Sequence, residues 1–146
     1  MEIKFKTFND LNTDELYALL QLRSEVFVVE QNCVYQDIDY KDQLATHLLA
    51  FEKNTLIGYL RLFRKGDYFD RVSIGRVVIK PEFRSKAYGH DILKKALDFV
   101  SSEWQENSIK LSAQTYLKSF YESHGFQQRG EEYLEDNIPH IAMYKE

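Results

Sequence analysis

A strand–loop–helix unit in the second half of the chain constrains its fold more than any other feature. Residues Ser73–Lys80 are rich in β-branched side chains and end at Pro81, a pattern that predicts a strand. After a loop at 82–88, apolar residues recur at helical spacing: Ile92, Leu93, Ala96, Leu97 and Val100, with Trp104 one turn later. Backbone N–H groups at the start of such a helix lie at the positive end of its dipole, where a pyrophosphate binds.

The loop of this unit carries two cations, Arg84 and Lys86, which would add positive charge to an anion site at the start of the helix. The loop lacks the Gly-Lys-Ser/Thr ending of a Walker A sequence and the three glycines of a dinucleotide fingerprint. Residue chemistry alone therefore leaves two interpretations open: a phosphate-binding loop, or an ordinary connection with solvated basic residues.

The remaining patterns alternate between strands and helices. Asn12 and Glu15 have capping-box spacing at the start of a helix that we expect to run to about Glu30. Strands are expected at 2–8, 47–52, 56–64, 109–113, 126–133 and 140–145, and a short helix at 116–124. This order favours one α/β or α+β domain over residues 1–146, with helices packed on a single sheet.

Composition supports a folded domain with a normal surface, since 44% of the residues are hydrophobic and 29% are charged. The 19 Lys and Arg residues against 23 Asp and Glu give a net charge of −4, which argues against a uniformly basic nucleic-acid surface. Cys33 is the only cysteine, so an intrachain disulfide and a Cys-based zinc site are excluded. The start of the chain lacks the apolar region of a signal peptide, and no apolar run suits a membrane span, so we expect a cytoplasmic protein.

Acidic residues gather in two segments, 37–42 and 131–136. The first contains Asp37, Asp39 and Asp42, and the second contains Glu131, Glu132, Glu135 and Asp136. Two interpretations are open: solvated loop charge, which charge pattern alone favours, or a surface that attracts a cation. The histidines do not form a metal-ligand pattern with Asp or Glu, and we expect no metal.

Two ordered motifs resemble the GNAT superfamily of acetyl-CoA-dependent N-acetyltransferases. Arg84-Ser85-Lys86-Ala87-Tyr88-Gly89 resembles the family's Arg/Gln-x-x-Gly-x-Gly/Ala signature between a strand and a long helix, and residues 111–114 with 120–126 resemble its second block. Residues 22–31, 35–39, 74–77 and 138–143 resemble the ElaA-like branch, so the resemblance covers nearly the whole chain. Ala87 stands where the family usually has glycine, so either this position needs no positive φ or the loop is distorted. Gln114 stands where Asn is common.

The resemblance implies a mixed, largely antiparallel sheet of six to seven strands with a splayed parallel pair and about four flanking helices. Acetyl-CoA would lie between 73–80 and 109–113. Its pantetheine arm would pair with the backbone of Val77, Val78 and Ile79, and a backbone N–H near Val77 or Val78 would polarise the thioester carbonyl. The pyrophosphate would bind to Arg84, Ser85, Lys86, Ala87, Tyr88 and Gly89, and Gln114 would hydrogen-bond the co-substrate.

Three side chains are candidates for the chemistry. Tyr121 lies where the family commonly places the tyrosine that protonates the departing thiolate, although a core aromatic residue would fit the pattern too. Glu30 and His140 are the candidates for the base, because both segments flank the acceptor groove in this fold. A structural role for His140, or binding of a cationic amine by Glu30, remains open. Cys33 has no base beside it in the sequence and is not expected to act as a nucleophile.

These observations predict transfer of an acetyl group to a primary amine of a small molecule or peptide. The acidic segments suggest that this acceptor is cationic. A non-catalytic acetyl-CoA-binding regulator is the alternative, motivated by Ala87 and by the lack of an obvious base. Nucleic-acid binding would depend only on Arg84, Lys86, Lys94 and Lys95, against the net charge. The aromatic content is compatible with a homodimer.

Overall fold

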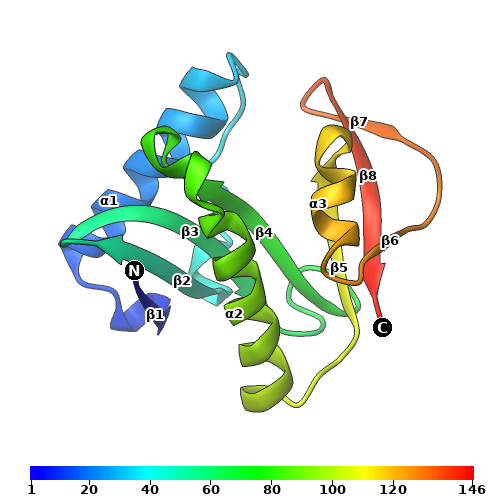
Figure 1. Cartoon of the computed structure of the whole chain (residues 1–146), viewed down its shortest axis with the longest axis horizontal. Coiled ribbons are helices and arrows are strands. Elements are labelled where there is room, and N and C mark those ends of the chain that lie inside the picture. The colour runs from blue at the N-terminus through cyan, green and yellow to red at the C-terminus, as the bar shows by residue number, and fades with distance from the viewer.

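The computed structural model, which describes residues 1–146, is built on one eight-stranded sheet (Figure 1). The strands are β1 (Glu2–Thr7), β2 (Thr46–Glu52), β3 (Thr55–Phe63), β4 (Val72–Ile79), β5 (Ile109–Gln114), β6 (Gln127–Gln128), β7 (Tyr133–Glu135) and β8 (Ile138–Lys145). Their order is β1-β2-β3-β4-β5-β8-β6, with β7 also on β8. Only β4 and β5 pair in parallel; all other neighbours are antiparallel. The mixed, largely antiparallel sheet is therefore confirmed.

The sheet has one strand more than the upper end of the expected range, because the strand expected at 126–133 divides into β6 and the later β7. Gly130 lies between them with φ of 84°, a left-handed conformation that interrupts an extended strand.

Helices cover both faces of the sheet. They are α1 (Thr13–Arg23), α2 (Tyr88–Glu103) and α3 (Lys118–Glu122), with a π-helical segment at Ser24–Glu30 and a 3₁₀ helix at Pro81–Lys86. Leu49 packs in the core cluster of α1, whereas its neighbours Leu48 and Ala50 pack in the cluster of α2 and α3. Since successive strand residues point to opposite faces, α1 lies on one face and α2 and α3 lie on the other. None of these helices combines the length and the apolar character that spanning a bilayer requires.

Local signals explain how α1 begins and how it continues. Asn12 Oδ1 accepts a hydrogen bond of 2.7 Å from the Glu15 backbone N–H, and Glu15 Oε1 accepts one of 3.0 Å from the Asn12 N–H, which confirms the capping box. The helical path does extend to Glu30, but its last part is π-helical. π-Helical turns widen a helix and occur often at functional sites.

β4 and β5 are paired only at one end. Their register joins Val72 to Ile109 and Ser73 to Lys110, and beyond these pairs the strands separate (Figure 1). On its other edge β4 is irregular opposite β3, and Arg76 there has φ of 52°. Such a bulge bends a strand locally. The expected splayed parallel pair is thus present.

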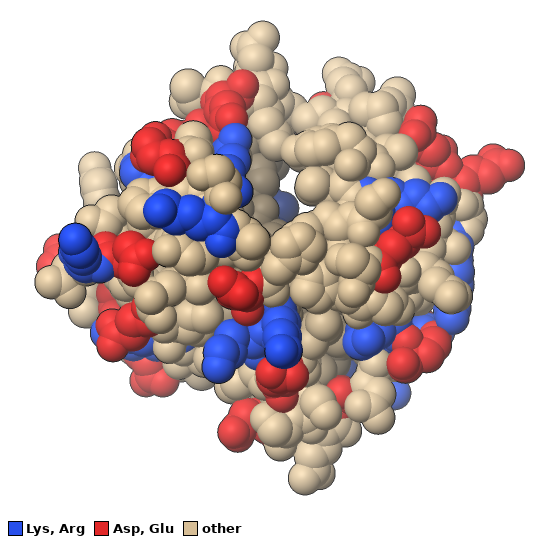
Figure 2. Space-filling model, viewed as in Figure 1, with Lys and Arg blue, Asp and Glu red and all other residues tan.

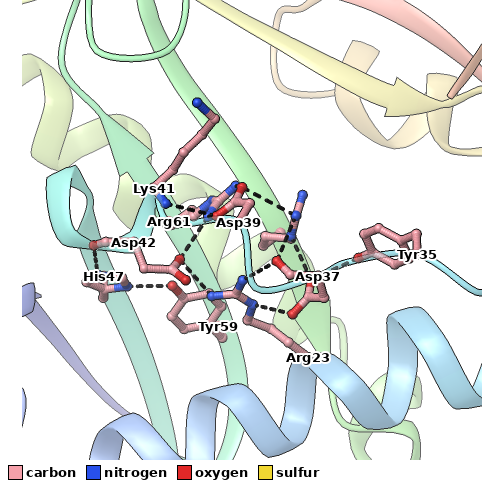
Figure 3. A network of polar contacts seen from close by, with 10 residues as sticks. Arg23, Tyr35, Asp37, Asp39, Lys41, Asp42, His47, Tyr59 and Arg61 are labelled. Atoms are coloured by element: carbon pink, nitrogen blue, oxygen red, sulfur yellow. Dashed lines mark hydrogen bonds and ion pairs between the residues drawn. The ribbon is translucent and has the colours of Figure 1, made fainter. Parts of the chain in front are cut away.

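The first acidic segment is a buried ion-pair network, and the favoured interpretation as solvated loop charge is wrong for it. Asp37 and Asp42 are only 6% and 5% exposed. Arg23 from α1 donates to Asp37 at 2.9 Å and to Asp42 at 2.8 Å, and Arg61 from β3 donates to Asp42 at 2.8 Å (Figure 3). Burial of such carboxylates requires paired cations, which this fold provides from distant parts of the sequence.

Candidate active site

A cleft of about 860 Å³ lies where β4 and β5 separate. In Figure 2 the surface is hollowed between the two halves of the molecule. The walls come from the π-helical segment and the loop after it, from β4, from the start of α2, from β5 and α3, and from the β7–β8 turn. Residues far apart in the sequence therefore meet around one opening.

Seven of the ten expected co-substrate residues line this cleft, namely Val77, Val78, Ile79, Arg84, Ala87, Gly89 and Gln114. Ser85, Lys86 and Tyr88 lie in the same loop but not on the cleft wall. Ser85 and Lys86 are exposed, and the Tyr88 hydroxyl donates to Glu52 at 2.7 Å.

Ala87 adopts the left-handed conformation that glycine would favour, with φ of 60° and ψ of 21°. Of the two alternatives for this position, the one without a positive φ is therefore wrong. The Ala87 carbonyl accepts from the backbone N–H of His90 at 3.1 Å and of Asp91 at 3.4 Å, as the first turn of α2 requires. The alanine therefore adopts a left-handed conformation at the cost of backbone strain, about 1–2 kcal/mol for an L-residue.

Glu30 and Arg84 meet at the rim of the cleft. The two side chains form a two-pronged ion pair with both N–O distances at 2.6 Å, and Arg84 Nε donates to the Ile79 carbonyl at 3.1 Å. The hydrogen bonds from Arg84 hold the pKa of Glu30 below its ordinary value. This ionised, paired carboxylate orients the arginine of the loop, and it is a weak proton acceptor.

Tyr121 on α3 is both a core aromatic residue and a cleft residue. It is 5% exposed, and it packs edge-on against Phe120 and Phe126 with ring centroids 5.0 Å and 5.9 Å away. Burial, with a smaller effect of Tyr116, raises the pKa of Tyr121 above its ordinary value. The phenol is therefore protonated at neutral pH and is available as a donor.

His140 on β8 is held from two sides. Its Nδ1 lies 2.7 Å from the Ile138 carbonyl, and its Nε2 lies 3.5 Å from Glu135 Oε2. Glu135 also accepts a hydrogen bond of 3.2 Å from Ser112 Oγ, and Ser112 is bonded in turn to the Tyr133 hydroxyl.

The sequence pattern places Glu135 only within an acidic run and does not identify it as a site residue. The signal was in the hairpin register, which pairs Tyr133 with His140 and Glu135 with Ile138 around a turn at Asp136 and Asn137. Residues two apart in a strand share a face, so this register places the Glu135 carboxylate beside the His140 imidazole.

Two contacts join the loop after the π-helical segment to the opposite wall of the cleft. Gln114 Nε2 donates to Gln31 Oε1 at 3.2 Å, and the Cys33 thiol lies 3.5 Å from the Asp136 carbonyl. Both contacts connect the β1–β4 half of the molecule to β5 and to the β7–β8 turn. They therefore hold the two walls of the cleft together at these positions.

Comparison with known proteins agrees with this architecture. Residues 9–146 match the family described as the acetyltransferase (GNAT) domain. The chain is 41% identical to protein ElaA of Escherichia coli over 140 residues, which cover 94% of this chain and 92% of that protein. It superimposes on the crystal structure of an acyl-CoA N-acyltransferase from Pseudomonas aeruginosa with a TM-score of 0.94 and 42% identity, covering 99% of both chains. The crystal structure of E. coli ElaA gives a TM-score of 0.92 with 39% identity and 99% coverage of both chains.

Proposed function

Because this chain belongs to the GNAT family and is an acyl-CoA-dependent N-acyltransferase, we propose that it transfers the acetyl group of acetyl-CoA to a primary amine. The amine would attack the thioester directly, without an acyl-enzyme intermediate. The acceptor would be a small molecule or a peptide.

The single observation that carries the proposal is that β4 and β5 separate after their last pair, Ser73 with Lys110. This separation leaves the β4 edge at Val77–Ile79 without a strand partner on the side that lines the cleft. An extended chain that carries amide groups, such as pantetheine, can pair with this edge as an added strand would. The open edge therefore supports binding of the co-substrate arm along Val77, Val78 and Ile79.

The loop at the start of α2 would hold the pyrophosphate. Residues Arg84–Ala87 precede the sixteen-residue helix α2, and Tyr88 and Gly89 begin it; the first backbone N–H groups of such a helix have no intrahelical partner. The guanidinium of Arg84, oriented by Glu30, adds a charge-assisted donor at the cleft rim. We assign Ser85, Lys86, Ala87, Tyr88 and Gly89 to this site through their backbone positions, and Gln114 to the opposite wall.

Two groups on the cleft wall would serve the acyl transfer itself. A backbone N–H near Val77 or Val78 would donate to the oxygen that becomes negative when nitrogen attacks the thioester carbon. When the carbon–sulfur bond breaks, the Tyr121 hydroxyl would donate to the thiolate. These roles agree with the position of both groups on the cleft wall.

His140 is our preferred base. A carbonyl oxygen can only accept, so the Nδ1 contact with Ile138 places a hydrogen on Nδ1 and leaves the lone pair of the neutral ring on Nε2. Glu30 remains a candidate, but its ion pair with Arg84 favours an orienting role over proton abstraction.

A thiol-release screen tests the proposal. Purified protein with acetyl-CoA is expected to release CoA only when a suitable primary amine is added, and mass spectrometry should identify the acetylated amine. Small amines and lysine-containing peptides form the panel, and longer acyl-CoA molecules test the choice of acyl group. Tight acetyl-CoA binding without thiol release for any amine would contradict transfer and support the non-catalytic regulator.

A further inference from the structure

Glu135 faces His140 across the cleft-lining end of the β7–β8 hairpin. Its two carboxylate oxygens have different partners. Oε1 accepts from Ser112 Oγ at 3.2 Å, whereas Oε2 points to His140 Nε2 at 3.5 Å and has no donor from the chain when the ring is neutral. The side chain is about half exposed, at 49%, so a ligand in the cleft can reach it.

When the His140 ring is neutral, its Nε2 and the Glu135 Oε2 atom are two neighbouring acceptors with no hydrogen between them. With the hydrogen of His140 on Nδ1, Nε2 presents a lone pair, and Glu135 Oε2 presents another 3.5 Å away. A single nitrogen atom can lie within hydrogen-bond distance of two acceptors at that separation. An ammonium group satisfies both, because it has several N–H donors and a positive charge beside the carboxylate.

No unpaired Lys or Arg side chain lines the cleft to compete for Glu135. Two arginines line the cleft, and both are already paired: Arg76 with Asp37 at 2.8 Å and Arg84 with Glu30 at 2.6 Å. Around the pair itself, β5 contributes Ser112, β7 contributes the Tyr133 ring stacked 6.2 Å from the imidazole, and the turn contributes the further carboxylate of Asp136. The local charge at this end of the cleft is therefore negative when His140 is neutral.

From this geometry, and on the basis of the proposed acyl transfer, we propose that Glu135 binds the ammonium group of the acceptor beside His140. The acceptor is then an amine that is cationic at neutral pH and has no carboxylate next to its amino group, because such a carboxylate would meet Glu135 and Asp136. In the proton step, an N–H bond of the ammonium breaks and an Nε2–H bond forms. The substrate amine becomes neutral and the His140 ring becomes an imidazolium. Glu135 stays ionised and lies beside the positive charge before and after the transfer.

The first test compares Glu135→Gln with Glu131→Gln. Glu131 is an exposed residue of the same acidic segment and does not line the cleft, so it is a matched control. With n-butylamine and Nα-acetyl-lysine amide as acceptors, Glu135→Gln is expected to raise the amine KM about tenfold, since the variant loses the charge of the acceptor for the ammonium group and the exposure of the side chain limits the effect. The acetyl-CoA Kd should be unchanged in both variants. Glycine, whose amino group neighbours a carboxylate, should be a poor acceptor for the wild type.

A binding measurement separates this inference from the proposed function. Binding of n-butylamine to the CoA complex is followed by NMR, and Glu135→Gln should weaken it about tenfold, whether or not any amine is acetylated. Amine turnover with an unchanged KM in Glu135→Gln, or a preference for glycine over n-butylamine, would overturn the ammonium site and leave acyl transfer intact. Absence of turnover together with Glu135-dependent binding would overturn the transfer and support the site.

Discussion

At the scale of single residues, Tyr121 shows how one position serves both packing and chemistry. Its ring contacts Phe120 and Phe126 in the core, and the residue still lines the cleft. Because burial raises its pKa, the hydroxyl is protonated at neutral pH and can donate a hydrogen bond to a thiolate. The core interpretation and the catalytic one therefore describe the same side chain.

We expect Tyr121→Phe to lower kcat by about 100-fold, since a positioned general acid typically contributes 10²–10⁴-fold. The ring and its packing are kept, so the acetyl-CoA Kd should change little. Steady-state kinetics with saturating acetyl-CoA and amine measure the effect, and Tyr17→Phe, on the exposed surface of α1, is the control. An unchanged kcat would remove Tyr121 from the proton transfer.

Ala87 gives a prediction about stability. Glycine relieves the left-handed strain, about 1–2 kcal/mol, but loses about 0.5–1 kcal/mol through the greater freedom of the unfolded chain. Ala87→Gly should therefore raise the free energy of unfolding by about 0.5 kcal/mol in a urea titration. Gly130→Ala is the reverse experiment, because it places an alanine at a φ of +84°. An added Cβ there would meet no atom within 4 Å, so the substitution introduces backbone strain without a steric clash. A lower stability of Ala87→Gly would contradict the strain.

At the scale of elements, the loop between the π-helical segment and β2 connects α1 to the β4 bulge. Asp37 accepts from Arg23 of α1 at 2.9 Å through Oδ2 and from Arg76 of β4 at 2.8 Å through Oδ1. Arg76 has the positive φ of the bulge, so the carboxylate holds the strained residue that precedes the proposed oxyanion donors. Asp37, which does not itself line the cleft, thus positions Arg76 in the cleft wall.

Asp37→Asn is expected to lower the free energy of unfolding by about 3 kcal/mol, because it leaves the three arginines of the largely buried network, Arg23, Arg61 and Arg76, with only two carboxylates. Asp67→Asn, at an exposed turn, is the matched control and should change it by less than about 0.5 kcal/mol. Chemical denaturation followed by circular dichroism measures both. Equal stabilities of the two variants would show that the network contributes little to the fold.

At the scale of the whole molecule, local patterns made most of the architecture predictable. The strand that Pro81 ends, the helix after the loop and the capping box at Asn12 all depend on neighbouring residues, and each is present. The strands expected at 47–52 and 56–64 are present as β2 and β3, which form an antiparallel hairpin. Its turn is at Lys53 and Asn54, whose φ values of 48° and 67° suit a two-residue connection.

Long-range pairing was not predictable from the same patterns. Asp37 has partners 14 and 39 residues away, so its sequence neighbours give no sign that it is buried. Glu135 is one of several acidic residues in its segment, and only the hairpin register distinguishes it. The backbone of Ala87 depends on the loop around it, since the residue type alone favours a negative φ.

The buried network also sets how the folded molecule responds to acid. Burial opposes ionisation of Asp39, but the hydrogen bonds and charge of Arg61 outweigh it and lower the pKa of Asp39 to about 2; Asp42, between Arg23 and Arg61, is lowered too. A carboxyl whose pKa is lower in the folded state stabilises the fold fully above the unfolded value, near 3.9, and loses this effect as the pH falls towards the folded value.

The free energy of unfolding is therefore expected to decline first below about pH 6.5, because burial lowers the pKa of His47 and of His124 and the unfolded chain takes up their protons first. It should fall further between about pH 4 and pH 2, where the paired carboxyl groups protonate. Asp39→Asn removes one of the carboxyl groups responsible, so this variant should be less stable at neutral pH and should lose less stability over the same interval. Urea midpoints measured at closely spaced pH values compare the two proteins. Parallel pH curves for wild type and Asp39→Asn would mean that protonation elsewhere causes acid unfolding and that the Arg61–Asp39 pair does not couple the fold to pH.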